Sequence, residues 1–286
     1  MKPYSIGIDL GGTRIKAAAV TTVGEVLSRE GFDTRDNWAA AVKRIIEGIE
    51  TRLGAAESIG LAAPGLVAPD GQSIGWMRGR LHGLEGLNWT AYLGRNVRVL
   101  NDAHAALLGE SWLGAAVDCA NVVMLTLGTG VGGAILCDGK LLRGHLGRAG
   151  HLGHIALDPD GAPDIVGTRG SLEDAIGEHT VWTRSDGRFA STLELVAAYK
   201  AKDPDATSFW LQSVGLLATG IASIINIVDP EVVVLGGGIA NAADALFDPL
   251  RDMLGRMEWR PYGSAVRVIP AALGEFAGAI GAARCD

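Results

Sequence analysis

The 286-residue sequence is poor in cysteine and aromatic residues and has no excess of positive charge. Its three cysteines, Cys119, Cys137 and Cys285, are far apart and lack the spacing of a metal site, which indicates a reduced, cytoplasmic protein. The formal net charge is −7, so the basic surface needed for nucleic-acid binding is not expected. No apolar run approaches the roughly 20 residues of a membrane span, so no membrane contact is expected either.

Two common nucleotide-binding motifs are missing or incomplete. The P-loop pattern G-x-x-x-x-G-K-[ST] does not occur. The segment GTGVGG, residues 128–133, has dinucleotide-type spacing, but a second apolar strand follows it instead of the required helix. The glycines at 236–238 do precede a helical pattern, but only about 45 residues follow, too few for a full Rossmann domain.

Glycine is abundant, at 41 residues, and falls singly or in pairs at the ends of apolar runs, which indicates tight turns at strand ends. Apolar strand patterns alternate with helical ones. Strands are expected in 4–10, 16–30, 58–67, 97–101, 121–142 and 231–238, and helices in 37–53, 102–114, 208–228, 244–254 and 274–286. This alternation predicts an α/β fold.

A strand, a polar glycine turn and a returning strand occur twice. The turns DLGGT, residues 9–13, and TLGTG, residues 126–130, lie 117 residues apart. The repetition predicts two related halves. Backbone N–H groups of two such turns, opposed across a cleft, could hold a triphosphate. The alternative is that both are ordinary hairpins whose glycines serve geometry alone.

Six segments follow one another along nearly the whole chain: IGIDLGGTRIK, LNDAHAALLGE, LTLGTGVGGAIL, GHLGH, DPEVVVLGGGI and LGEFAGAIGAA. Together they resemble the ROK family of sugar kinases, within the actin-like ATPase superfamily. The resemblance implies a two-lobed actin-like ATPase (ribonuclease H-like) fold, with mixed sheets flanked by helices. The smaller N-terminal lobe would comprise residues 1–102 and 273–286, and the larger lobe residues 103–272.

The same resemblance implies an ATP- and Mg²⁺-dependent kinase that phosphorylates a hexose or an N-acetylhexosamine at the 6-hydroxyl. Glucose, N-acetylglucosamine and N-acetylmannosamine are the expected kinds of substrate, and a homodimer is the expected assembly. The alternative is a catalytically inactive sugar-sensing or regulatory member of the family.

The resemblance also assigns nucleotide contacts. Gly11, Gly12 and Thr13 match the first phosphate loop; Gly128, Thr129 and Gly130 match the second; Gly236, Gly237 and Gly238 match the turn that passes the adenosine. Asp9 matches the carboxylate that holds Mg²⁺ through water, which would explain an acidic side chain inside a strand pattern. Lys16 is left open between a phosphate contact and a solvated strand residue.

Asp102 is the expected catalytic base, because phosphoryl transfer to an alcohol needs a proton acceptor near the hydroxyl. The alternative is that Asp102 is a helix N-cap. The residues expected to bind the sugar are Gly65, Arg80, Asn101, Asp102, His151, His154 and Glu173.

Three positions depart from the family pattern. His151 replaces a glutamate in the E-x-G-H motif. Two outcomes are open: weaker hydrogen bonding to a plain hexose, or a preference for a substrate with a carbonyl group, such as a 2-acetamido sugar. Arg80 stands where relatives have an asparagine near the sugar. Asp164, Val166 and Ser171 replace three zinc-binding cysteines while Glu173 remains, so no structural zinc is expected.

Overall fold

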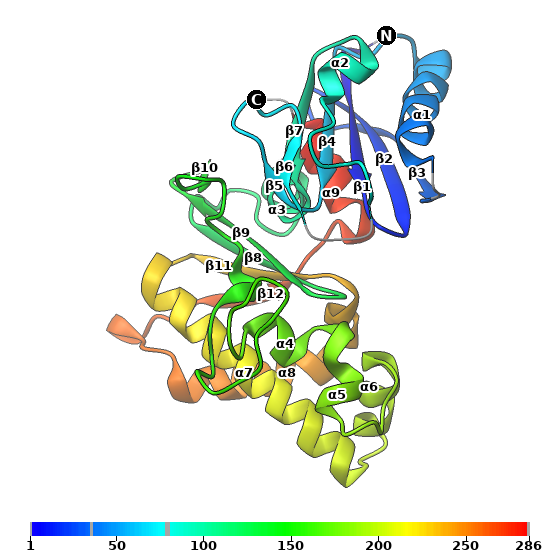
Figure 1. Ribbon diagram of the computed structural model, residues 1–286. Helices are drawn as coiled ribbons and strands as arrows, with labels where there is room; N and C mark the ends of the chain where they lie inside the picture. The colour runs from blue at the N-terminus through cyan, green and yellow to red at the C-terminus, as the bar shows by residue number, and fades with distance from the viewer. Residues whose placement is uncertain (1, 35–36, 78–80, 285–286) are drawn as a thin grey trace. The chain divides into compact units, whose positions relative to one another are not determined.

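The computed structural model describes residues 2–34, 37–77 and 81–284, so Arg80 lies outside the described residues. The chain forms two compact units (Figure 1). The first comprises Met1–Asp118, Leu141–Ala149 and Ala272–Asp286, and the second Cys119–Lys140 and Gly150–Ala271. The family resemblance implied a division at Asp102. The structure instead includes helix α3 (Asp102–Leu113) in the first unit, where it packs against helix α9 (Ala277–Ala283).

The first unit contains a five-stranded mixed sheet in the order β3-β2-β1-β4-β7. Its strands are β1 (Tyr4–Leu10), β2 (Arg14–Thr21), β3 (Val26–Asp33), β4 (Ser58–Ala63) and β7 (Val97–Asn101). Strands β1, β2 and β3 pair antiparallel, as expected for consecutive hairpins, whereas β1, β4 and β7 run parallel. A small sheet of β5 (Leu66–Val67) and β6 (Ile74–Trp76) and the short helix α2 (Trp89–Leu93) complete this unit.

Side chains of successive residues in the central strand β1 point to opposite faces of this sheet. Ile6 and Ile8 are fully buried in a cluster that includes residues of helix α1 (Trp38–Leu53). On the other face, a Cβ on Gly7 would lie 1.8 Å from the carbonyl oxygen of Ala279 in α9. Glycine in the strand and small residues in α9 therefore allow the two backbones to approach closely.

The second unit is built on a sheet in the order β10-β9-β8-β11-β12. Its strands are β8 (Val122–Leu127), β9 (Val131–Cys137), β10 (Lys140–Leu141), β11 (Val232–Gly236) and β12 (Arg267–Pro270). As in the first unit, the first strand pairs antiparallel with the second and parallel with the fourth of the series. The two glycine turns that were compared in the sequence therefore occupy equivalent places in two sheets of the same strand order.

The long helix α7 (Pro204–Val228) is the central helix of the second unit and contributes Trp210, Leu217 and Ile221 to its core. It begins earlier than the sequence pattern predicted, because the Asp203 side chain accepts a hydrogen bond from the Ala206 N–H and Pro204 occupies the first turn. Contrary to expectation, α7 is long and apolar enough to cross a membrane by length and composition. Its buried face instead packs within the unit, as a core helix does.

The other helices and turns of this unit are short, apart from α8. They are η1 (Leu152–His154), α4 (Leu172–Ile176), η2 (Glu178–Thr180), α5 (Val181–Arg184), α6 (Thr192–Lys200), η3 (Gly238–Ala242), α8 (Asp244–Met257) and η4 (Pro261–Gly263). The turn η5 (Gly274–Phe276) precedes α9 in the first unit.

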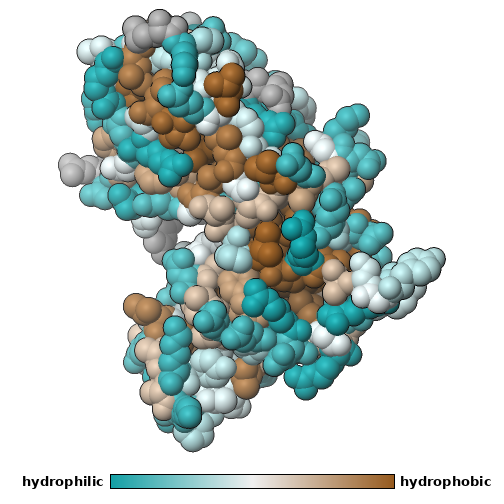
Figure 2. Space-filling model, turned by 180° about the vertical axis from the view of Figure 1, so that it is seen from behind, coloured by the Kyte–Doolittle hydropathy of each residue, from teal (hydrophilic) through white to brown (hydrophobic). Residues whose placement is uncertain are grey.

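Large hydrophobic side chains are exposed in both units, among them Val23, Trp182 and Trp259. Figure 2 shows hydrophobic atoms among hydrophilic ones on one face of the molecule. Scattered exposure of this kind is normal for a globular protein and does not locate a binding site. The chemistry of the turns at the strand ends is more informative.

Candidate active-site residues

In the first unit, the parallel strands β1, β4 and β7 bring the predicted polar residues to one edge of the sheet. Asp9 lies opposite Ala62 of β4, and Ala63 of β4 lies opposite Asn101 at the end of β7. Because carboxyl ends of neighbouring parallel strands lie side by side, the segment 9–13 and the junction at 101–102 meet at the same edge. Ligands of α/β proteins commonly bind beyond the carboxyl ends of the parallel strands.

The junction between β7 and α3 is fixed by Asn101, which is the helix N-cap. Its Oδ1 accepts hydrogen bonds from the N–H groups of Ala103 (3.0 Å) and His104 (3.2 Å), and its Nδ2 donates to the Gly65 carbonyl at 3.1 Å. Asp102 is the first residue of the helix and is exposed, so the alternative that Asp102 serves as the N-cap is wrong. The cap holds an exposed carboxylate at a defined place on a rigid junction.

The Asp9 side chain is only partly exposed, and its surroundings disfavour the ionised form of its carboxyl. Burial raises the pKa of its carboxyl from 3.8 to about 7; the nearby Lys16 lowers the pKa and Asp102 raises it. Lys16 is the cross-strand neighbour of Asp9 on β2. A carboxylate whose ionisation is disfavoured by burial and by a second carboxylate is stabilised by a bound cation. The carboxylates of Asp9 and Asp102 therefore offer the oxygen donors that suit Mg²⁺, an ion that prefers carboxylate oxygen and retains several waters.

Three glycines of the predicted nucleotide loops have open space where a side chain would lie. A Cβ on Gly12, Gly128 or Gly238 would meet no heavy atom within 4 Å. The backbone of these three residues also lacks the positive φ that favours glycine. Neither packing nor backbone geometry requires glycine at these positions, so the space beside each backbone is available to a ligand.

The second glycine turn lies between β8 and β9 and contacts α4. Oε2 of Glu173 accepts a hydrogen bond from the Val131 N–H at 2.9 Å, and a Cβ on Gly130 would lie 2.2 Å from the same oxygen. Glu173 is therefore packed directly against the predicted phosphate loop. Of the nearby glycines, Gly237 has φ +87° and lies against the backbone of Leu127, so it keeps the turn after β11 close to the end of β8.

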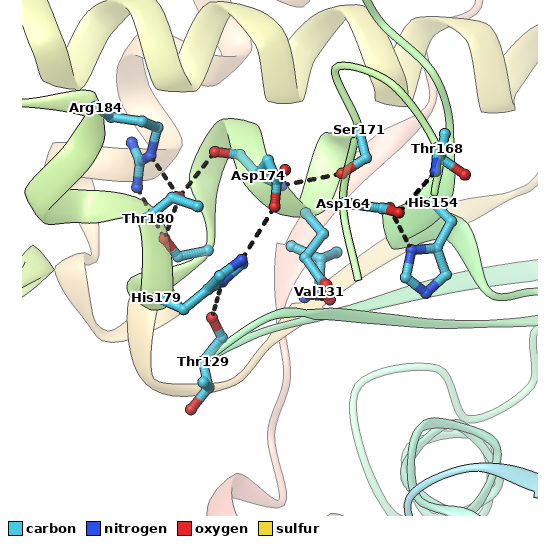
Figure 3. A network of polar contacts seen from close by, with 12 residues as sticks. Thr129, Val131, His154, Asp164, Thr168, Ser171, Asp174, His179, Thr180 and Arg184 are labelled. Carbon is cyan, nitrogen blue, oxygen red and sulfur yellow. Dashed lines mark hydrogen bonds and ion pairs between the residues drawn. The ribbon is translucent and has the colours of Figure 1, made fainter. Parts of the chain in front are cut away.

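The loop at 154–168 is held by a hydrogen-bonded His154–Asp164 pair (Figure 3). Nδ1 of His154 lies 2.7 Å from Oδ2 of Asp164, and Oδ1 of Asp164 accepts from the N–H groups of Val166 (3.0 Å) and Thr168 (2.8 Å). Burial alone would raise the pKa of Asp164, but these hydrogen bonds outweigh it, and the pKa is lowered. His151 precedes η1 and is partly exposed.

Within the described residues, one group of potential metal ligands comes close together: ligand atoms of Glu173, Asp174 and His179 lie within 4.8 Å of one another. Hydrogen bonds to protein groups already account for this arrangement, since Glu173 binds the Val131 N–H and His179 bridges Asp174 and the Thr129 carbonyl. Asp174 and His179 were not singled out from the sequence, because no spacing or motif connects them to the turn at 128–130.

Comparisons with known proteins show similarity along nearly the whole chain. The model of the ROK family matches residues 5–285. A glucokinase from Halalkalibacterium halodurans is 33% identical over 311 aligned positions, covering 97% of this chain and 93% of that protein. An N-acetyl-D-glucosamine kinase from Erwinia tasmaniensis is 31% identical over 268 positions, covering 86% of this chain and 87% of that protein.

A solved structure also resembles this chain. The ROK family glucokinase from Streptomyces griseus in complex with glucose and AMPPNP has a TM-score of 0.81 and 28% identity, and the match covers 98% of each chain. The fold class predicted from the sequence, with mixed sheets flanked by helices as in actin-like ATPases, is confirmed. On the family match and the extent of the alignments, the chain belongs to the ROK family.

Proposed function

We propose that this protein is an ATP- and Mg²⁺-dependent kinase that phosphorylates the 6-hydroxyl of a hexose or an N-acetylhexosamine. The observation that carries the proposal is the junction at 101–102, where Asn101 caps α3 and leaves the carboxylate of Asp102 exposed at the same sheet edge as Asp9. Relatives named as glucokinases and N-acetylglucosamine kinases support this class of substrate.

The proposed chemistry gives Asp102 the role of general base. Its carboxylate accepts the proton of the sugar hydroxyl as the hydroxyl oxygen forms a bond to the γ-phosphorus, and the bond from phosphorus to the bridging oxygen breaks to release ADP. Asp9 would hold Mg²⁺ through water, and the ion would neutralise charge on the phosphate oxygens. The open space beside Gly12 and Gly128 would admit phosphate oxygens. In the second turn the N–H groups of Thr129 and Gly130 would donate to them, because the Gly128 N–H already donates to the Gly130 carbonyl.

For the sugar, the proposal uses groups with remaining hydrogen-bonding capacity. Asn101 uses Oδ1 for the helix cap and one Nδ2 hydrogen for Gly65, which leaves the other Nδ2 hydrogen for a sugar oxygen. Glu173 uses Oε2 for Val131, which leaves Oε1 as an acceptor. A neutral His154 that donates from Nδ1 to Asp164 presents Nε2 as an acceptor for a hydroxyl.

The test is an ADP-release assay with the wild-type protein and the variant Asp102→Asn. The sugars are glucose, mannose, allose, fructose, N-acetylglucosamine and N-acetylmannosamine. We expect turnover with at least one hexose or N-acetylhexosamine, and a decrease in kcat of at least roughly 100-fold in the variant with little change in KM for ATP.

The matched control is Asp33→Asn, which removes an exposed carboxylate of the same unit. It should retain wild-type turnover. Near-normal kcat in Asp102→Asn would remove Asp102 from the role of base. Sugar binding without ADP release across the whole panel would instead identify a sugar-binding protein without kinase activity.

A further inference from the structure

The glycine turn at 128–130 is held from one side by the segment 177–179 (Figure 3). The Glu178 N–H donates to the Gly128 carbonyl at 2.9 Å, and the His179 N–H donates to the Thr129 carbonyl at 3.0 Å. The side chain of His179 makes a third contact, because its Nδ1 lies 2.7 Å from the same Thr129 oxygen. Two donors of one residue therefore converge on one carbonyl of the predicted phosphate loop.

These contacts determine the direction of the loop amides. In a trans peptide the C=O and the following N–H point to opposite sides. Anchoring the carbonyls of Gly128 and Thr129 toward the segment 177–179 therefore turns the N–H groups of Thr129 and Gly130 to the opposite side. These are the donors that a phosphate group would use.

The position of His179 between two acceptors requires a proton on each ring nitrogen. Nδ1 faces a carbonyl oxygen, which only accepts, and Nε2 lies 3.0 Å from Oδ1 of Asp174, which as a carboxylate also only accepts. A neutral imidazole has one N–H and can satisfy only one of them. Only an imidazole with a proton on each ring nitrogen satisfies both acceptors at once.

The surroundings keep Asp174 in place. The Ser171 hydroxyl caps its helix by accepting from the Asp174 N–H, and the Thr180 hydroxyl donates to its carbonyl at 2.8 Å. Arg184 donates to Thr180 and to the Gly177 carbonyl. Two carboxylates lie close to the imidazole, those of Asp174 and Glu173 of α4. Arg184 of α5 and Glu178 of η2 are the next charged groups, and Arg184 interacts electrostatically with Glu178 and Asp174.

We propose that His179, in its imidazolium form and paired with Asp174, is a positioning residue that orients the turn 128–130 for the phosphates of ATP. The inference rests on the proposed function, since it takes this turn as a nucleotide-binding element. Loss of the ring proton leaves the Nε2 lone pair against the Asp174 carboxylate, so the Asp174–His179–Thr129 connection is broken and ATP binding weakens as the pH rises.

The first glycine turn provides an internal contrast. It is anchored by Thr34, whose hydroxyl donates to the Gly11 carbonyl and whose N–H donates to the Thr13 carbonyl, both at 2.8 Å. That anchor contains no ionisable group. Among the described residues, the second turn is thus the one whose anchor includes an ionisable side chain, His179.

The test compares KM for ATP and KM for the sugar from pH 5.5 to pH 9 in wild type, His179→Ala and Asp174→Asn. In Asp174→Asn, the new amide donates to Nε2 of a neutral imidazole while Nδ1–H still donates to Thr129, so the connection no longer needs the extra proton. We divide KM for ATP of the wild type by KM for ATP of Asp174→Asn at each pH. This ratio should rise about fivefold from pH 5.5 to pH 9. Protonation of ATP itself changes KM equally for both proteins, so its effect cancels in this ratio.

His179→Ala should raise KM for ATP about tenfold at pH 6, as expected for loss of a hydrogen bond to a charged group, and leave KM for the sugar unchanged. Thr183→Ala, an exposed position on α5, is the matched control and should behave as wild type. Identical pH dependence of wild type and Asp174→Asn, or a change of less than twofold in His179→Ala, would overturn the proposal.

The variant Gly128→Ala separates this proposal from the proposed function. Its Cβ enters open space in the protein, so it should fold normally and raise KM for ATP by obstructing the phosphates. If Gly128→Ala weakens ATP binding and His179→Ala does not, only the positioning role fails. If Gly128→Ala has no effect, the nucleotide assignment of the turn fails, and the role of His179 fails with it.

Discussion

Replacing Asp9 with asparagine should make the ligand-free protein more stable at alkaline pH while it abolishes kinase activity. The structure raises the pKa of this carboxyl from 3.8 to about 7, mainly through burial. The folded protein therefore binds a proton more tightly than the unfolded chain does. The contribution of Asp9 to the free energy of unfolding therefore falls as the pH rises from about 4 to about 7, and then levels off.

The magnitude follows from this pKa. From pH 5 to the folded-state pKa of about 7, each pH unit removes about 1 kcal/mol from the contribution of Asp9 to the stability of the wild type. The amide side chain of the Asp9→Asn variant does not titrate, so the stability of the variant lacks this contribution. Between pH 5 and pH 8 the variant should therefore gain up to about 3 kcal/mol relative to wild type.

The assay is urea unfolding of both proteins at pH 5, 6, 7 and 8 without nucleotide or divalent cations. The difference between the two proteins isolates Asp9, because the other ionisable groups are common to both. Asp33→Asn, at an exposed position, should show no such trend. A difference between wild type and Asp9→Asn that does not change with pH, or that changes in favour of wild type, would refute the reasoning.

Two further predictions follow from buried carboxylates and from the departures in the zinc motif. Glu110→Ala should lower the free energy of unfolding by at least about 3 kcal/mol in urea titrations, because the N–H groups of Ala115, Ala272 and Leu273 lose their buried acceptor; an effect below about 1 kcal/mol would contradict this. Metal analysis of the purified protein should find no stoichiometric zinc, since Asp164 already binds His154 and two backbone N–H groups; one zinc per chain would disprove it.

Much of the fold could be predicted locally. The hairpin of β1 and β2, the start of α3 at Asp102 and the turn before β9 all follow from apolar periodicity interrupted by glycine or by a capping residue. The short helices α4, α5 and α6 and the strand β12 were not predicted, because a segment of four to nine residues is too short for a periodic pattern to establish itself.

The division between the units could not be found in the same way. The boundary expected at Asp102 lies instead after Asp118, since α3 packs against α9, which is more than 150 residues away in the sequence. A Cβ on Gly109 of α3 would lie 2.4 Å from the Ala277 carbonyl oxygen, so the close approach depends on residues from both ends of the chain. No local pattern reveals such a contact.

The sequence by itself determined the family, the two glycine turns and the positions of Asp9 and Asp102, because these depend on residue type and order along the chain. Only the tertiary structure decided the surroundings of the ionisable side chains, and with them the pKa of Asp9 and the hydrogen-bond partners of His179. Burial and the distant Asp102 raise the pKa of Asp9, and the Thr129 carbonyl that His179 contacts is 50 residues away, so the environment of each side chain depends on what surrounds it in space.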